Sequence, residues 1–197
     1  MKSNVCALEK GGKGLDKILA EVEHVAEYNK LGEKQTLRLR LLAEELSGML
    51  GGILDNFSGE FWAEDRNGTY ELHTVIKVDE MTYELRNELL KLSSSGKNFS
   101  ARGIMGKIRA AIDNLILASA GMPFDETMYL SGVGYGVEVN GIYSAWSLNR
   151  YRDDIKKQKD TEEAWDELEK SIVANLADDV TVGVKGRKVE VIVYKKI

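Results

Sequence analysis

The spacing of apolar and polar positions predicts two consecutive amphipathic helices near the start of the chain. The first should run from Leu15 to about Tyr28, because its apolar residues recur at helical spacing. The second should lie between Leu31 and Leu54, where one arc at about 100° per residue gathers an apolar set. That set consists of Leu41, Leu42, Leu46, Met49, Leu50 and Ile53. Residues 1–14, which include Gly11, Gly12 and Gly14, are expected to form a mobile start.

Glu45 is the anomalous position of the second helix. The same rotation places Glu45 between Leu41 and Met49, inside the apolar arc, whereas Glu44 points outward. A carboxylate on a buried face costs several kcal/mol unless it is paired, hydrogen-bonded or protonated. Two interpretations stay open: Glu45 has a chemical role, or it lies at the edge of the arc and pairs with Arg38.

A β-hairpin is predicted around Asn67-Gly68, a sequence typical of tight turns, which joins the β-rich runs 60–64 and 70–78. The second run alternates. Tyr70, Leu72, Thr74, Ile76 and Val78 share one face, and Glu71, His73 and Lys77 share the other. We therefore expect one face of the sheet to be buried under helices and the other to be solvated.

The middle of the chain combines further helices with a polar loop. A short helix is expected at 83–92, and another from Gly103 to about Ser119, with Ile104, Ile108, Ala111, Ile112, Leu115 and Ile116 as its core stripe. Between them lies the serine- and glycine-bearing loop 93–100. Such a loop before a helix can hold an anion on free backbone N–H groups, or it can be an ordinary loop. Its spacing is not that of a P-loop.

Residues 120–159 differ in composition, with five glycines between 121 and 141, the only proline, and interleaved tyrosines and tryptophan. We expect one domain over 1–197, in which 120–159 is a glycine- and aromatic-rich insertion or lid. Within it, 137–143 can form a hairpin or a flap, and 150–159 is expected to be a charged connector. A capping box at 160–163 then predicts a helix with Trp165, Leu168, Ile172 and Leu176 inward, and 180–194 predicts a closing hairpin.

Composition excludes several classes of function. The net charge is −5 and no long basic block exists, so a nucleic-acid partner is not expected. Cys6 is the only cysteine, and the two histidines, His24 and His73, show no ligand spacing. We therefore expect no metal ligand and predict that both histidines are exposed or half-buried. No signal peptide and no run of about 18 apolar residues is visible, which favours the cytoplasm and no membrane partner.

The order of these elements and the run Leu41-Leu42-Ala43-Glu44-Glu45-Leu46 resemble the Bergerat-fold ATPases, the superfamily of gyrase, heat-shock chaperone, histidine kinase and mismatch-repair ATPases. The branch it is most similar to is that of the anti-sigma-factor serine kinases. The resemblance covers most of the chain apart from about 120–160. It implies an α+β fold, a two-layer α/β sandwich whose mostly antiparallel mixed sheet is covered on one face by helices.

The resemblance also implies a nucleotide site. Glu45 corresponds to a general base, and Asp79 falls near an adenine-binding aspartate. The segment 102–108 resembles a glycine box that meets the phosphates of ATP. The residues expected around those phosphates are Ser95, Gly96, Lys97, Gly103, Gly106 and Lys107.

Departures from the family pattern argue against an active enzyme. Met49 stands where the family has a magnesium-binding asparagine, and a thioether is a poor ligand for Mg²⁺. The glycines expected after Asp79 are absent, and the glycine box is longer by one residue. Because phosphoryl transfer depends on Mg²⁺ and positioning, we expect it to be lost.

Three functional hypotheses follow from the resemblance and its departures. The first is a bacterial, anti-sigma-factor-like regulatory module that docks a sigma factor or an anti-anti-sigma-like regulator, through the aromatics of 120–159. The second is an active ATP-dependent serine-protein kinase or ATPase with Glu45 as base. The third is another two-layer α+β domain of unrelated role. Homodimerisation stays open in all three.

Overall fold

A computed structural model describes residues 1–8, 14–54, 58–77, 103–104, 106–108, 111–112, 138–139, 142–157, 162–185 and 188–197. These residues form an α+β fold with an antiparallel sheet and helices. The described strands are β1 (Cys6–Leu8), β2 (Ser58–Arg66), β3 (Thr69–Lys77), β4 (Glu138–Val139), β5 (Ile142–Ser147), β6 (Asp179–Lys185) and β7 (Lys188–Lys196). The helices are α1 (Leu15–Tyr28), α2 (Glu33–Leu54), α5 (Leu148–Lys157), α6 (Glu162–Lys170) and α7 (Ile172–Leu176).

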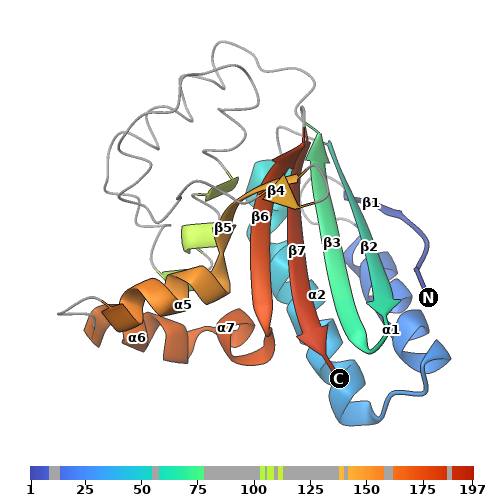
Figure 1. Cartoon of the computed structure of the whole chain (residues 1–197). Helices are drawn as coiled ribbons and strands as arrows, with labels where there is room; N and C mark the ends of the chain where they lie inside the picture. The colour runs from blue at the N-terminus through green and yellow to red at the C-terminus, as the bar shows by residue number, and fades with distance from the viewer. Residues whose placement is uncertain are drawn as a thin grey trace.

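The sheet joins two hairpins that are far apart in sequence. Its order is β1-β2-β3-β7-β6-β5-β4, so the predicted hairpin β2–β3 pairs with the closing hairpin β6–β7 (Figure 1). Every pairing between described strands is antiparallel, whereas a mixed sheet was expected. At the β2–β3 turn, Asn67 and Gly68 both adopt positive φ, and the Asp65 carboxylate accepts a hydrogen bond from the Gly68 N–H at 2.8 Å. The Asn-Gly prediction is confirmed.

The first eight residues extend along β2, and the expected mobile start is wrong for them. The Ser3 N–H donates to the Ala63 carbonyl at 2.8 Å, and the Ser3 hydroxyl accepts from the Ala63 N–H at 2.9 Å. Leu8 is buried in the core. An edge strand offers a row of free backbone donors and acceptors, and here the chain's own beginning satisfies them.

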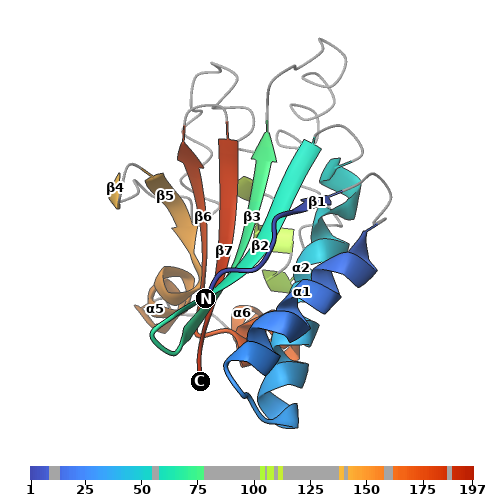
Figure 2. The same cartoon turned by 90° about the vertical axis from the view of Figure 1, so that its right-hand side faces the viewer.

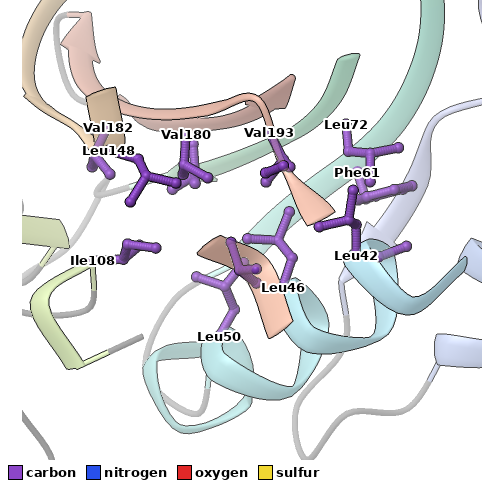
Figure 3. Packing of buried hydrophobic residues seen from close by; sticks show 14 of the residues in the cluster. Leu42, Leu46, Leu50, Phe61, Leu72, Ile108, Leu148, Val180, Val182 and Val193 are labelled. Atoms are coloured by element: carbon purple, nitrogen blue, oxygen red, sulfur yellow. The ribbon is translucent and has the colours of Figure 1, made fainter. Parts of the chain in front are cut away.

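One face of the sheet is covered by α1 and α2 (Figure 2). Between these layers Leu42, Leu46 and Leu50 of α2 meet sheet side chains that include Phe61, Leu72 and Val193 (Figure 3). No described helix covers the opposite face of β2, β3 and β7 (Figure 1). That opposite face of the three strands is called the open face below.

Part of the expected insertion belongs to the core. Trp146 on β5 is only 1% exposed, and Leu148 and Ile155 of α5 are buried with Ile108. The charged connector expected at 150–159 is therefore wrong over the residues of α5, because one apolar side of this charged segment packs inward. The hairpin interpretation of 137–143 is confirmed where it is described, since β4 pairs with β5.

The helix predicted after residue 160 is interrupted. Ser171 separates α6 from α7, and its hydroxyl accepts a hydrogen bond from the Ala174 N–H as an N-cap. The interruption changes the phase of the apolar stripe. Leu168 is buried as expected, whereas Trp165, in the same helix as Leu168, and Ile172, after the interruption, are exposed.

Among the helices that the structure describes, none combines the length and apolar character required to cross a bilayer.

Candidate functional site

The buried face of α2 differs from the predicted arc, which changes the interpretation of Glu45. The buried side chains are Leu39, Leu42, Ala43, Leu46, Ser47 and Leu50. Leu41 and Met49 are half-buried, and so is Glu45 between them. Glu45 thus lies at the edge of the buried face, not inside it. Within the described part of the chain, no hydrogen bond or ion pair joins it to Arg38, so the proposed pairing is wrong there.

Three of the expected phosphate-site residues, Gly103, Gly106 and Lys107, lie at described helical positions within 103–104 and 106–108. Gly103 has φ +75°, and Gly106 is buried. The Lys107 ammonium lies 3.7 Å from a Glu167 carboxylate oxygen and 5.1 Å from the centre of the Tyr151 ring. Burial raises the pKa of the Tyr151 hydroxyl, and the Lys107 charge opposes that rise. Lys107 is therefore engaged by α5 and α6.

The other expected nucleotide-site residues, Asp79, Ser95, Gly96 and Lys97, lie outside the described residues. No hydrogen bond or ion pair between described residues links Glu45 to Lys107. The expected nucleotide site therefore stays a prediction, because half of its residues lie outside the described ranges.

A different group of titratable side chains meets on the open face. Glu64 of β2, Glu71 and His73 of β3, and Glu190 of β7 form what we call the His73 cluster. The strand register explains the meeting: Glu64 lies directly opposite Glu71, and His73 lies opposite Trp62. Glu190 is two places from the residue opposite His73 on β7.

The His73 cluster is largely buried, although the sequence predicted a solvated face. His73 is 4% exposed and Glu71 is 8% exposed. The Trp62 ring stacks on the His73 ring at a centroid distance of 4.7 Å and an interplanar angle of 10°. The Lys2 ammonium in turn lies over the Trp62 ring, 4.4 Å from the ring centre. Among the described residues, long side chains of the flanking strands thus cover this central strand, and no described helix lies over it.

Both ring nitrogens of His73 face carboxylates. Nε2 lies 2.9 Å from Glu71 Oε2 and 3.9 Å from Glu64 Oε1, and Nδ1 lies 3.0 Å from Glu190 Oε1. The Arg66 Nε hydrogen-bonds to Glu64 Oε1 and lies 3.4 Å from Glu71 Oε2. Arg66 and His73 therefore approach the same two carboxylate oxygens.

The local charge is negative. Among the described residues of the cluster and its ion pairs, three carboxylates face one guanidinium, that of Arg66, so with a neutral imidazole this group carries two net negative charges. Neighbouring groups respond to this charge. Burial, and then the Glu71 and Glu190 charges among others, raise the pKa of Tyr194 against the opposing hydrogen bond with Thr181. The hydrogen bond to Glu64 raises the pKa of Arg66. Chemically, the cluster can bind a proton or a cation.

The sequence carries one signal for this cluster. A two-residue Asn-Gly turn fixes the register of the hairpin, so counting outward from Asn67-Gly68 pairs Glu64 with Glu71. That count places two carboxylates side by side next to His73. The position of Glu190 depends on the pairing of β3 with β7, which local sequence does not specify.

No protein-family model, no curated protein and no solved structure matches the chain.

Proposed function

We propose that the chain is a regulatory protein-binding module on a histidine-kinase-like ATPase scaffold, similar to the anti-sigma factors, in which nucleotide binding is weak or lost. The observation that supports the proposal is the arrangement of its helix and hairpins: α2 lies under a sheet in which β2–β3 pairs with β6–β7. The family resemblance implies the same order of helix, first hairpin and closing hairpin along the chain, and a sheet covered on one face by helices.

The loss of nucleotide chemistry is supported by Met49. Its side chain is half-buried against the core one turn after Glu45, so the thioether stands where the family pattern has an oxygen donor. Mg²⁺ requires oxygen ligands in near-ideal octahedral geometry. Lys107 also supports the proposal, because Glu167 and Tyr151 already engage its ammonium.

The docking surface that we propose is the turn between α1 and α2. Tyr28, the last residue of α1, and Leu37, in the second turn of α2, flank this turn in sequence and are 70% and 56% exposed. Large apolar and aromatic side chains are typical interface anchors. Trp146, one of the aromatics of 120–159, is 1% exposed, so we do not include it in the proposed surface. The partner class is a sigma factor or an anti-anti-sigma-like regulator.

Calorimetry with ATP and ADP, each with and without Mg²⁺, tests the proposal. We expect no micromolar, Mg²⁺-dependent binding. Micromolar binding that requires Mg²⁺, together with hydrolysis or phosphoryl transfer that Glu45→Gln abolishes, would instead establish the active kinase or ATPase.

The docking surface has its own test. Purified regulators of the proposed classes should bind the full chain, and Leu37→Asp should weaken that binding about tenfold or more. Val5→Asp is the matched control, because Val5 is similarly exposed, at 53%, but precedes α1 in the sequence and lies outside the turn between α1 and α2. Equal binding by the Leu37→Asp variant would contradict the placement of the surface.

A further inference from the structure

We propose that Glu64, Glu71 and His73 form a binding site for a divalent cation of the zinc class. Their candidate ligand atoms all lie within 4.8 Å of one another. One imidazole nitrogen with two carboxylate oxygens is a donor set that suits Zn²⁺, whereas Mg²⁺ and Ca²⁺ prefer oxygen alone. This site differs from the expected nucleotide site, and it contradicts the expectation from sequence that no residue binds a metal.

The distances fit such an ion with small side-chain adjustments. Ligand atoms about 2.0–2.1 Å from a tetrahedral zinc lie roughly 3.4 Å from each other. His73 Nε2 lies 2.9 Å from Glu71 Oε2 and 3.9 Å from Glu64 Oε1, so the two observed separations bracket that value. A fourth position remains for water or a ligand, as in zinc sites with three protein ligands.

The positions of the carboxylates around His73 supply a second geometric argument. A neutral imidazole carries one N–H, and a carboxylate facing its other nitrogen meets a lone pair. Both nitrogens of His73 face carboxylate oxygens at hydrogen-bonding distance. The nitrogen without an N–H therefore faces a carboxylate oxygen with nothing between them unless a proton, on either group, or a cation lies there. The cation also neutralises Glu64 and Glu71, which are like charges directly opposite in the register.

The groups around the ligands orient them. Glu190 Oε1 lies 3.0 Å from Nδ1 and is placed to accept a hydrogen bond from it, while Nε2 faces Glu71 and Glu64. Metal-binding histidines regularly donate their second nitrogen to a carboxylate in this way. The stacked Trp62 ring fixes the plane of the imidazole. His73 is thus held in the orientation that metal binding needs before any ion arrives.

Arg66 is the counter-ion when no metal is bound. Its Nε contacts Glu64 Oε1 and Glu71 Oε2, which are the two oxygens assigned to the metal. Its side chain is 60% exposed at the end of β2, so it can turn to solvent when an ion binds. Metal and guanidinium therefore compete for the same oxygens.

Titration calorimetry of the chelator-treated full chain with Zn²⁺ tests the proposal. We expect one ion per chain at micromolar or tighter affinity. His73→Gln and Glu64→Gln should each weaken binding at least tenfold, and Glu190→Gln should weaken it about 10–100-fold. Arg66→Gln should tighten binding, because it removes the competing cation. His24→Gln and Cys6→Ser are matched controls that should leave affinity unchanged.

Spectroscopy separates this site from adventitious binding. Co²⁺ should quench the fluorescence of Trp62, and Trp62→Phe should remove that quenching while Trp165→Phe does not. If a His73 variant does not fold, Arg66→Gln still tests the proposal. The Arg66 side chain is 60% exposed, so its replacement should leave the fold intact while changing the affinity for Zn²⁺. The proposal is overturned if millimolar Zn²⁺ does not bind, if His73→Gln binds as the parent does, or if Arg66→Gln binds less tightly. Nitrogen NMR that shows both His73 nitrogens protonated and unaffected by Zn²⁺ would also overturn it.

Discussion

Replacing Thr74 by valine should stabilise the fold. Thr74 lies on the core face of β3, opposite Phe61 on one side and Val191 on the other, and it is 0% exposed. Its hydroxyl has no hydrogen-bond partner among the described residues. Valine has nearly the same shape, so Thr74→Val exchanges an unsatisfied hydroxyl for a methyl group without opening a cavity.

The magnitude follows from the cost of burying that hydroxyl. Mutational data put an unsatisfied buried hydroxyl at about 1–3 kcal/mol, so we expect Thr74→Val to raise the free energy of unfolding by roughly 1–2 kcal/mol. For a domain of this size, each kcal/mol corresponds to about 2–4 °C in Tm. Urea denaturation followed by circular dichroism measures the change, with the slope expected to stay constant.

Thr74→Ser is the matched control. It keeps the hydroxyl and loses the buried methyl group, so it should lower stability by about 1 kcal/mol. If Thr74→Val is instead destabilising while Thr74→Ser is neutral, the hydroxyl contributes to stability and the reasoning above is refuted.

Three further changes test other parts of the structure. Leu46→Ala should lower the free energy of unfolding by about 2–5 kcal/mol in urea, because Leu46 is 2% exposed between α2 and the sheet; a loss under about 1 kcal/mol would contradict this packing. Gly48→Ala should raise the free energy of unfolding by up to about 1 kcal/mol, and with it Tm, since the added methyl group meets nothing within 4 Å in a helix interior. A lower Tm would be inconsistent with that open space. Burial opposes ionisation of Asp178, but hydrogen bonds from the Lys196 N–H and Lys195 prevail and lower its pKa from 3.8. A lowered folded-state pKa means that this stabilisation is present above the unfolded pKa and is lost as pH falls through the folded value. Asp178→Asn should therefore be less stable than the parent at neutral pH, by under about 1 kcal/mol for a half-exposed group, with the gap closing in chemical denaturation below pH 3.8; a gap that persists there would exclude the ionic contribution.

Local patterns in the sequence were sufficient for most elements. The helix predicted from Leu15 to Tyr28 matches α1, and the second predicted helix matches α2 from Glu33. Both hairpins lie where turn chemistry and alternation placed them. Helical and strand periodicities are properties of neighbouring residues, so they can be read before any tertiary contact is known.

Burial was harder to predict, because it depends on which elements pack together. Rotation alone put Glu45 inside the apolar arc of α2, yet the sheet contacts a face centred nearer Leu39 and Ala43. Alternation alone made Glu71 and His73 solvent-facing, yet Trp62 and the side chains of β7 cover them. Exposure is decided by neighbouring strands, which a single periodic segment does not contain.

The sequence by itself determined the helices, the hairpins and, through Asn67-Gly68, the opposition of Glu64 and Glu71. Only the tertiary structure decided that β3 pairs with β7 and thereby brings Glu190 to within 3.0 Å of His73, a residue 117 positions away. Short-range order follows from backbone sterics and turn geometry, whereas a contact across the sheet exists only after the whole chain has folded.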